Sequence, residues 1–131
     1  MLILLATERA DLRLSIELLL SEEPGVVVVG AASETEGMLA LLDSTHPDLL
    51  IVDWDLPGRT LAELVPLIRA NTPCIHILAL GNESSLLDAA LKAGADDYVV
   101  KGDPPEQLLE TFRHARSHHK SETISPSPLE E

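Results

Sequence analysis

The sequence predicts an α/β domain in which helices cover both faces of a parallel sheet. Short continuous apolar runs alternate along the chain with longer segments that have helical spacing. Hydrophobic residues make up 45% of the chain and aromatic residues only 2%, which favours aliphatic packing of helices on a sheet. The length of 131 residues suits one domain whose core needs no disulfide bonds.

Five apolar runs are expected to be strands. Continuous apolar runs of this length are typical of parallel strands that are buried on both faces. They cover residues 2–6, 26–30, 49–52, 75–80 and 98–100.

Five segments between and after these strands are expected to be helices. They cover residues 11–20, 34–42, 61–70, 84–93 and 105–116. Ser33 is the expected N-cap of the second helix, with Glu36 completing a capping box. Pro66 is expected to kink or shorten the third helix, and Gly94 to end the fourth.

Strict alternation of strands and helices implies right-handed crossovers, so the strands form one parallel sheet between two layers of helices. With five strands, the predicted fold is a flavodoxin-like (βα)5 three-layer sandwich with sheet order 2-1-3-4-5.

The predicted domain covers residues 1–117. Residues 118–131 are rich in Ser and Pro and show no periodicity, so they are expected to form a flexible tail or linker.

The formal net charge is −13. Such a chain repels nucleic acid and anionic membranes, so direct contact with either is not expected. The acidic excess is compatible with a divalent cation site, but more often such an excess is only a surface that keeps the domain in solution.

Cys74 is the single cysteine and lies in an apolar run, so it is interpreted as a small core residue compatible with a reducing cytoplasm. The N-terminal apolar run lacks a basic leader and is too short for a signal peptide or a membrane span. A cytoplasmic location is expected.

Three charged residues follow strands that end at the same edge of the sheet. Glu8 follows strand 1, Asp53 follows strand 3 and Lys101 follows strand 5. In the predicted strand order, the crevice between strands 1 and 3 is the expected binding site.

This set of residue types suits phosphoryl transfer. A carboxylate can attack phosphorus and form an acyl phosphate, while nearby cations neutralise the charge on the phosphoryl oxygens. Asp53 is the candidate nucleophile and Lys101 the candidate phosphate clamp. Glu8 is the candidate ligand of a Mg²⁺ ion, which prefers oxygen ligands.

Two segments carry a family resemblance. Residues 47–58, PDLLIVDWDLPG, and residues 90–101, ALKAGADDYVVK, resemble the receiver domains of bacterial two-component response regulators. The resemblance covers about residues 1–117. The segment after Lys101, GDPPEQLL, is most similar to receivers that carry a helix-turn-helix output domain.

The resemblance implies a signalling protein rather than an enzyme that turns over substrate. Asp53 would accept a phosphoryl group from a sensor histidine kinase and relay it as a surface change. Lys101 would be the family's lysine, and Tyr98 would occupy its aromatic switch position. Mg²⁺ would bind Glu8, Asp53 and the main-chain carbonyl of Asp55. Further implied partners are a second copy of the chain and an output domain outside it.

Two departures from the family pattern give an alternative. The family has two adjacent acidic residues where this chain has Thr7 and Glu8, so Mg²⁺ binding is expected to be weak. The family also has a Ser or Thr at the end of strand 4, and no residue of 78–81 carries a hydroxyl. The alternative is a degenerate receiver that acts as a phosphorylation-independent interaction or dimerisation module.

Overall fold

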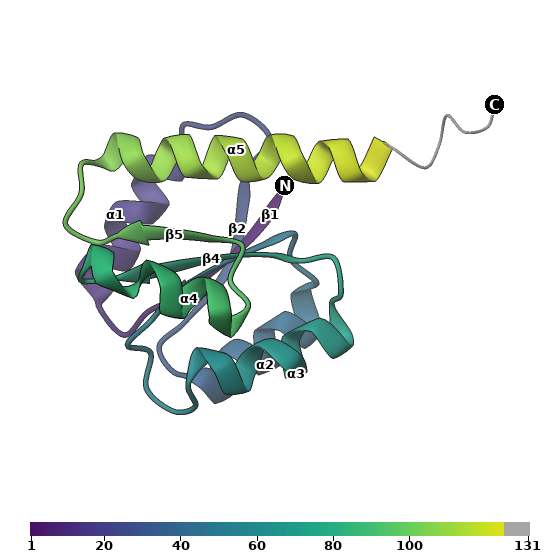
Figure 1. Cartoon of the computed structure of the whole chain (residues 1–131). Helices are drawn as coiled ribbons and strands as arrows, with labels where there is room; N and C mark the ends of the chain where they lie inside the picture. Colours follow the sequence, from purple (N-terminus) through teal and green to yellow (C-terminus); the bar gives the residue numbers. More distant parts are fainter. Residues whose placement is uncertain (125–131) are drawn as a thin grey trace.

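The computed structural model describes the backbone of residues 1–124 and the side-chain surroundings of residues 1–117. Five parallel strands form one sheet in the order β2-β1-β3-β4-β5 (Figure 1). The strands are β1 (Leu2–Ala6), β2 (Val27–Ala32), β3 (Leu49–Asp53), β4 (His76–Gly81) and β5 (Asp97–Val100). The predicted fold class and strand order are confirmed.

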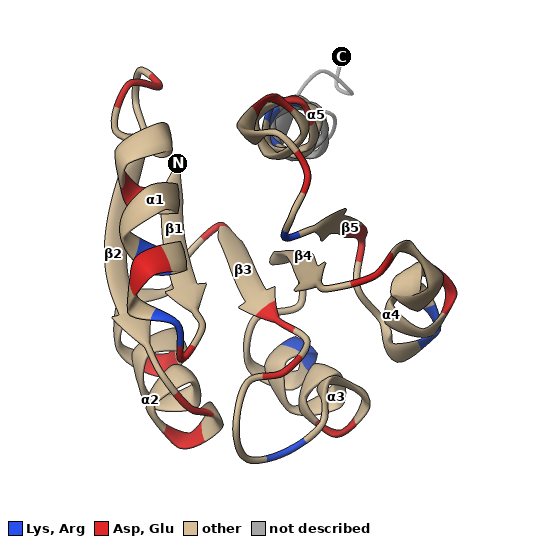
Figure 2. Cartoon of the chain, turned by 90° about the vertical axis from the view of Figure 1, so that its left-hand side faces the viewer, with Lys and Arg blue, Asp and Glu red and all other residues tan. Residues whose placement is uncertain are grey.

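Helices cover both faces of this sheet (Figure 2). They are α1 (Ala10–Leu20), α2 (Thr35–Thr45), α3 (Leu61–Asn71), α4 (Leu87–Ala93) and α5 (Pro105–Ile124), with a 3-10 turn η1 (Ser84–Leu86) before α4. Side chains of α1 and α5 pack on one face, and side chains of α2, α3 and α4 pack on the other.

The apolar runs form two cores because successive side chains of a strand point to opposite faces. In β3, Leu50 and Val52 join the core under α2, α3 and α4. Leu49 and Ile51 join the core under α1 and α5. The central strands are therefore buried on both faces, as the continuous apolar runs predicted.

The start of β4 corrects the prediction for Cys74. The strand begins at His76, and Cys74 is exposed in the turn before it. The sequence predicts a strand over residues 75–80, but residue 75 precedes the strand and Cys74 lies in the exposed turn before it. Cys74 is not a core residue.

The predicted N-cap of α2 was wrong, and so was the predicted shortening of α3 at Pro66. Glu34, not Ser33, caps α2, and its carboxylate accepts a hydrogen bond from the Gly37 amide at 2.9 Å. Pro66 does not shorten α3, which continues to Asn71. A capping box between Thr60 and Glu63 fixes the start of that helix.

The fourth and fifth helices end differently. Gly94 ends α4 with a φ of +115°, a backbone conformation that favours glycine, as predicted. Helix α5 continues past the predicted end at residue 116 to Ile124. No proline follows Pro105 until Pro126, so the sequence contains no strong helix breaker before Ile124. Residues 118–124 therefore continue α5, and the rest of the predicted tail or linker, 125–131, lies outside the described residues.

Within the part of the chain that the structure describes, no helix is both long enough and apolar enough to span a membrane.

Candidate functional site

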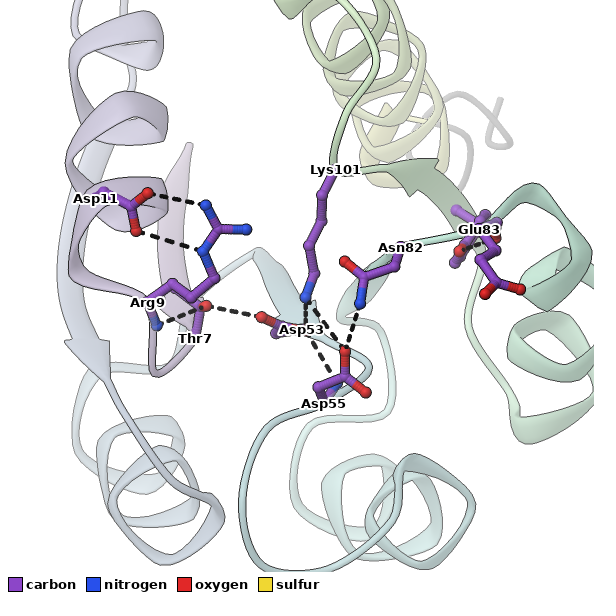
Figure 3. Close-up of polar contacts among 9 residues, drawn as sticks. Thr7, Arg9, Asp11, Asp53, Asp55, Asn82, Glu83 and Lys101 are labelled. Atoms are coloured by element: carbon purple, nitrogen blue, oxygen red, sulfur yellow. Dashed lines mark hydrogen bonds and ion pairs between the residues drawn. The ribbon is translucent and has the colours of Figure 1, made fainter.

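The carboxyl ends of β1, β3 and β5 bring three side chains together, as the strand order predicts (Figure 3). Ala6 of β1 lies beside Val52 of β3 in the sheet, so Thr7 and Asp53 are neighbours. Lys101 follows β5 and reaches across the end of β4 to Asp53. Acidic residues at the end of β3 and a basic residue after β5 mark this edge (Figure 2).

Asp53 is a buried carboxylate, with 3% of the residue exposed. Its Oδ1 accepts from Lys101 Nζ at 2.6 Å and from the Asp55 main-chain amide at 2.9 Å. Its Oδ2 accepts from the Thr7 hydroxyl at 2.8 Å. Both oxygens of this buried carboxylate are therefore paired.

Lys101 balances two carboxylates. Its ammonium lies 2.6 Å from Asp53 Oδ1 and 3.4 Å from Asp55 Oδ2. The main-chain amide of Lys101 donates to the Gly81 carbonyl, which fixes the start of the side chain beside the end of β4. The Asn82 amide also donates to Asp55 Oδ2 at 3.2 Å.

Thr7 is a site residue that the sequence reasoning treated only as a lost charge. It is buried, and its Oγ1 accepts from the Arg9 main-chain amide at 3.2 Å while donating to Asp53. The Arg9 side chain turns away and pairs with Asp11 at 2.8 Å. This hydrogen bond lowers the pKa of Asp11 and raises that of Arg9.

Only two of the three predicted metal ligands lie close together. Asp53 and Asp55 lie together, and Glu8 is exposed beside the buried Thr7. The Glu8 carboxylate makes none of the contacts that hold Asp53. Among the described residues, no three His, Cys, Asp or Glu side chains form a group that could hold a metal ion.

Tyr98 lies in β5, and its hydroxyl is not among the donors to Asp53. Its hydroxyl donates to the Glu83 carbonyl, and burial raises the pKa of its phenol. Its ring lies against Gly81, where a Cβ atom would come within 2.1 Å of the Tyr98 hydroxyl oxygen. The end of β4 carries no hydroxyl: Leu78, Ala79, Leu80 and Gly81 are all buried there.

Trp54 follows Asp53 and is half-buried against the core under α2, α3 and α4. Its main-chain amide donates to the Leu80 carbonyl at 2.7 Å, which holds the loop after β3 against β4. Because it is the single tryptophan of the chain, its fluorescence reports on this loop.

The fold and this edge of the sheet define the class of protein. The family model described as the response regulator receiver domain matches residues 3–113, so the chain belongs to this family. The resemblance inferred from the two segments is confirmed. Receiver domains are signalling domains of response regulators, and the relatives favour this function over the alternative of an interaction module.

Several individual response regulators are similar to this chain. The nitrate/nitrite response regulator protein NarL of Escherichia coli K12 is 33% identical over 128 residues, covering 95% of this chain and 59% of NarL. The phosphate regulon transcriptional regulatory protein PhoB of Rhizobium meliloti is 38% identical over 89 residues, covering 64% of this chain and 39% of PhoB. The chain thus spans three fifths or less of these relatives.

Solved structures agree on the fold. The receiver domain of AraT, a response regulator from Geobacillus stearothermophilus, superimposes with a TM-score of 0.83 at 26% identity, covering 93% of this chain and 97% of that one. The isolated receiver domain of RcsB from Salmonella enterica serovar Typhimurium, with phosphomimetic BeF3⁻, gives a TM-score of 0.80 at 21% identity, covering 89% and 88%. The second match supports the fold alone.

Proposed function

We propose that Asp53 accepts a phosphoryl group from a sensor histidine kinase. The observation that supports this most directly is the buried Asp53 carboxylate at the end of β3, with the Lys101 ammonium 2.6 Å from its Oδ1. A carboxylate oxygen attacks the phosphorus, and Lys101 neutralises charge that moves onto the phosphoryl oxygens.

The acyl phosphate would then act on the surface that α4, β5 and α5 form. Lys101 follows β5 directly, and Tyr98 lies three residues before it in the same strand. A shift of Lys101 from Asp53 toward a phosphoryl group therefore pulls on the strand that holds Tyr98. Tyr98 is proposed as the switch residue on this surface.

A Mg²⁺ ion fits this site only weakly. Glu8, Asp53 and the Asp55 main-chain carbonyl are the proposed ligands, and the bound ion would supply additional positive charge to the phosphoryl oxygens. The buried side chain next to Glu8 is the Thr7 hydroxyl, which donates to Asp53 and cannot add negative charge. Few carboxylates are therefore available to the ion.

The remaining partners follow from the family and the charge. A helix-turn-helix output domain outside this chain and a second copy of the chain are the proposed partners besides the kinase. The net charge of −13 argues against direct contact of these residues with nucleic acid or anionic membranes. The cytoplasmic location, the domain boundary at residue 117 and the absence of substrate turnover stay predictions.

Phosphorylation of the intact chain tests this proposal. We expect acetyl phosphate with Mg²⁺ to add one phosphoryl group, seen by intact mass spectrometry, and expect Asp53→Asn to show no adduct. Asp43→Asn is the matched control because it makes the same change at an exposed position of α2, and it should label like the wild type.

Absence of an adduct on the wild type, under conditions that label an ordinary receiver, would contradict the proposal. It would favour the phosphorylation-independent interaction module instead.

A further inference from the structure

We infer that Thr7 is a positioning residue that, together with Lys101, holds the Asp53 carboxylate for phosphoryl transfer without relying on a divalent cation. Transfer to Asp53 then depends only weakly on Mg²⁺, and Thr7 sets that dependence. The inference rests on the proposed function of Asp53 as the acceptor.

The direction of the Thr7 hydroxyl is fixed by its two contacts. Its oxygen accepts from the Arg9 main-chain amide at 3.2 Å and lies 2.8 Å from Asp53 Oδ2. A carboxylate can only accept, so the Thr7 hydroxyl is the donor to Oδ2. Thr7 and Asp53 are 2% and 3% exposed, so water does not compete for this hydrogen bond.

The two oxygens of Asp53 are thereby divided between different donors. Oδ1 faces the Lys101 ammonium and the Asp55 amide, and Oδ2 faces Thr7. The Lys101 side chain is only 6% exposed, so its charge is weakly screened where it meets Asp53. The chain's own groups therefore supply both oxygens of the carboxylate with donors and place one positive charge beside it.

Groups beside both oxygens of this carboxylate disfavour the binding of a cation. The Lys101 charge repels it near Oδ1, and the Thr7 hydroxyl occupies one of the two acceptor positions of Oδ2. Mg²⁺ loses its hydration water reluctantly and needs several oxygen ligands in strict geometry. The described residues offer no group of three acidic, His or Cys side chains there.

The transfer step balances without a metal or a proton from Thr7. Asp53 Oδ1, on the Lys101 side, forms the bond to phosphorus. The bond from phosphorus to the donor atom breaks, and the leaving group keeps the electron pair. The negative charge of the carboxylate leaves with the leaving group, and the charged phosphoryl oxygens arrive at Asp53, where Lys101 can pair with them. Thr7 continues to donate to Oδ2, which becomes the acyl carbonyl oxygen.

Three substitutions at Thr7 distinguish the effect of its hydroxyl as a hydrogen-bond donor from the effect of a negative charge at this position. Thr7→Ser keeps the hydroxyl, Thr7→Val removes it at nearly the same size, and Thr7→Asp replaces it with a carboxylate. Two measurements are made on the intact chain. The first is the initial rate of labelling by acetyl phosphate, with a chelator and across a Mg²⁺ titration. The second is Mg²⁺ affinity from Trp54 fluorescence without any phosphoryl donor.

We expect the wild type and Thr7→Ser to label with the chelator at rates within about threefold of their rates in excess Mg²⁺. Thr7→Val should lose about tenfold or more of the chelator rate, the range for a lost hydrogen bond to a charged group. Thr7→Asp should bind Mg²⁺ at least about tenfold more tightly than the wild type and label only when Mg²⁺ is present.

The outcomes distinguish the two proposals. If the wild type labels with Mg²⁺ but not with the chelator, this inference is overturned and the acceptor role of Asp53 stands. If Thr7→Val labels like the wild type, Thr7 has no positioning role. If the wild type labels under no condition, the proposed function itself fails. Should Thr7→Val not fold, the Mg²⁺ affinity of Thr7→Asp decides, because an affinity equal to the wild type overturns the inference.

Discussion

Gly81 allows the Tyr98 ring to lie across the carboxyl end of β4. A Cβ at residue 81 would come within 2.1 Å of the Tyr98 hydroxyl oxygen and 2.8 Å of two ring carbons. The hydroxyl is also tied to the Glu83 carbonyl, so the ring cannot move away without losing that hydrogen bond. Glycine is required here for space.

We therefore expect Gly81→Ala to lower the free energy of unfolding by about 1–2 kcal/mol, because overpacking outweighs the smaller entropy of the unfolded chain. Urea denaturation measures it. Gly102→Ala is the matched control, since no atom lies within 4 Å of the added Cβ, and it should stay within about 0.5 kcal/mol of the wild type. Equal stability of the two variants would contradict this account.

The sequence predicts some contacts of the site and not others. Asp53 and Lys101 were predicted as neighbours because parallel strands end at one edge, and the 2.6 Å ion pair agrees with that geometry. The part played by Thr7 was missed because a residue's position after a strand does not give the direction of its hydroxyl. That direction depends on the Arg9 amide, a contact within a turn.

Helix α3 accommodates Pro66 at the cost of one main-chain hydrogen bond. Proline has no amide proton to donate to the Ala62 carbonyl, yet the helix continues to Asn71. The buried face of α3, with Leu61, Leu64 and Ile68, compensates for the lost bond. Tertiary packing thus overrides a helix-breaking residue.

Pro66→Ala is expected to raise the free energy of unfolding by about 1–2 kcal/mol, because the restored hydrogen bond exceeds the added entropy of the unfolded chain. Pro66 is exposed, so little packing is lost. Urea denaturation again measures the change. Pro73→Ala, in the exposed turn after α3, should bring no gain. A Pro66→Ala variant no more stable than the wild type would show that α3 has adapted to the proline.

The ends of elements were harder to predict than their order. The apolar period placed all five strands within about two residues of their observed ends, because buried positions dominate the pattern. Caps depend on the φ and ψ of single residues, so Ser33 was chosen where Glu34 is the cap. Helix α5 extends beyond the predicted end at residue 116, because a polar composition does not end a helix when no proline or glycine lies between Pro105 and Pro126.

At the scale of the whole molecule, the charge of −13 means that acidic side chains repel one another over much of the surface. Exposed ion pairs such as Arg9–Asp11 relieve only part of this repulsion. The Lys101–Asp53 pair is buried and therefore little affected by salt.

We expect the free energy of unfolding to rise by about 0.5–1 kcal/mol between low and physiological concentrations of NaCl, because screening weakens the net repulsion. Urea denaturation at each salt concentration measures it. Replacing the exposed Asp43, Glu106 and Glu110 with their amides should reduce this gain. Stability that falls with added salt would show instead that exposed ion pairs outweigh the repulsion.

Strand β5 lies at the edge of the sheet and pairs only with β4, so backbone hydrogen bonds alone hold its register weakly. Side chains fasten it at both ends. At its start, Asp97 Oδ2 lies 2.6 Å from His76 Nε2 of β4, and just past its end Lys101 is tied to Asp53 of β3. A shift of one residue in the register between β5 and β4 would break both of these side-chain contacts. If Asp53 accepts a phosphoryl group as proposed, the contact at the Lys101 end changes while the His76–Asp97 pair stays in place, so we expect the strand to turn about its His76 end.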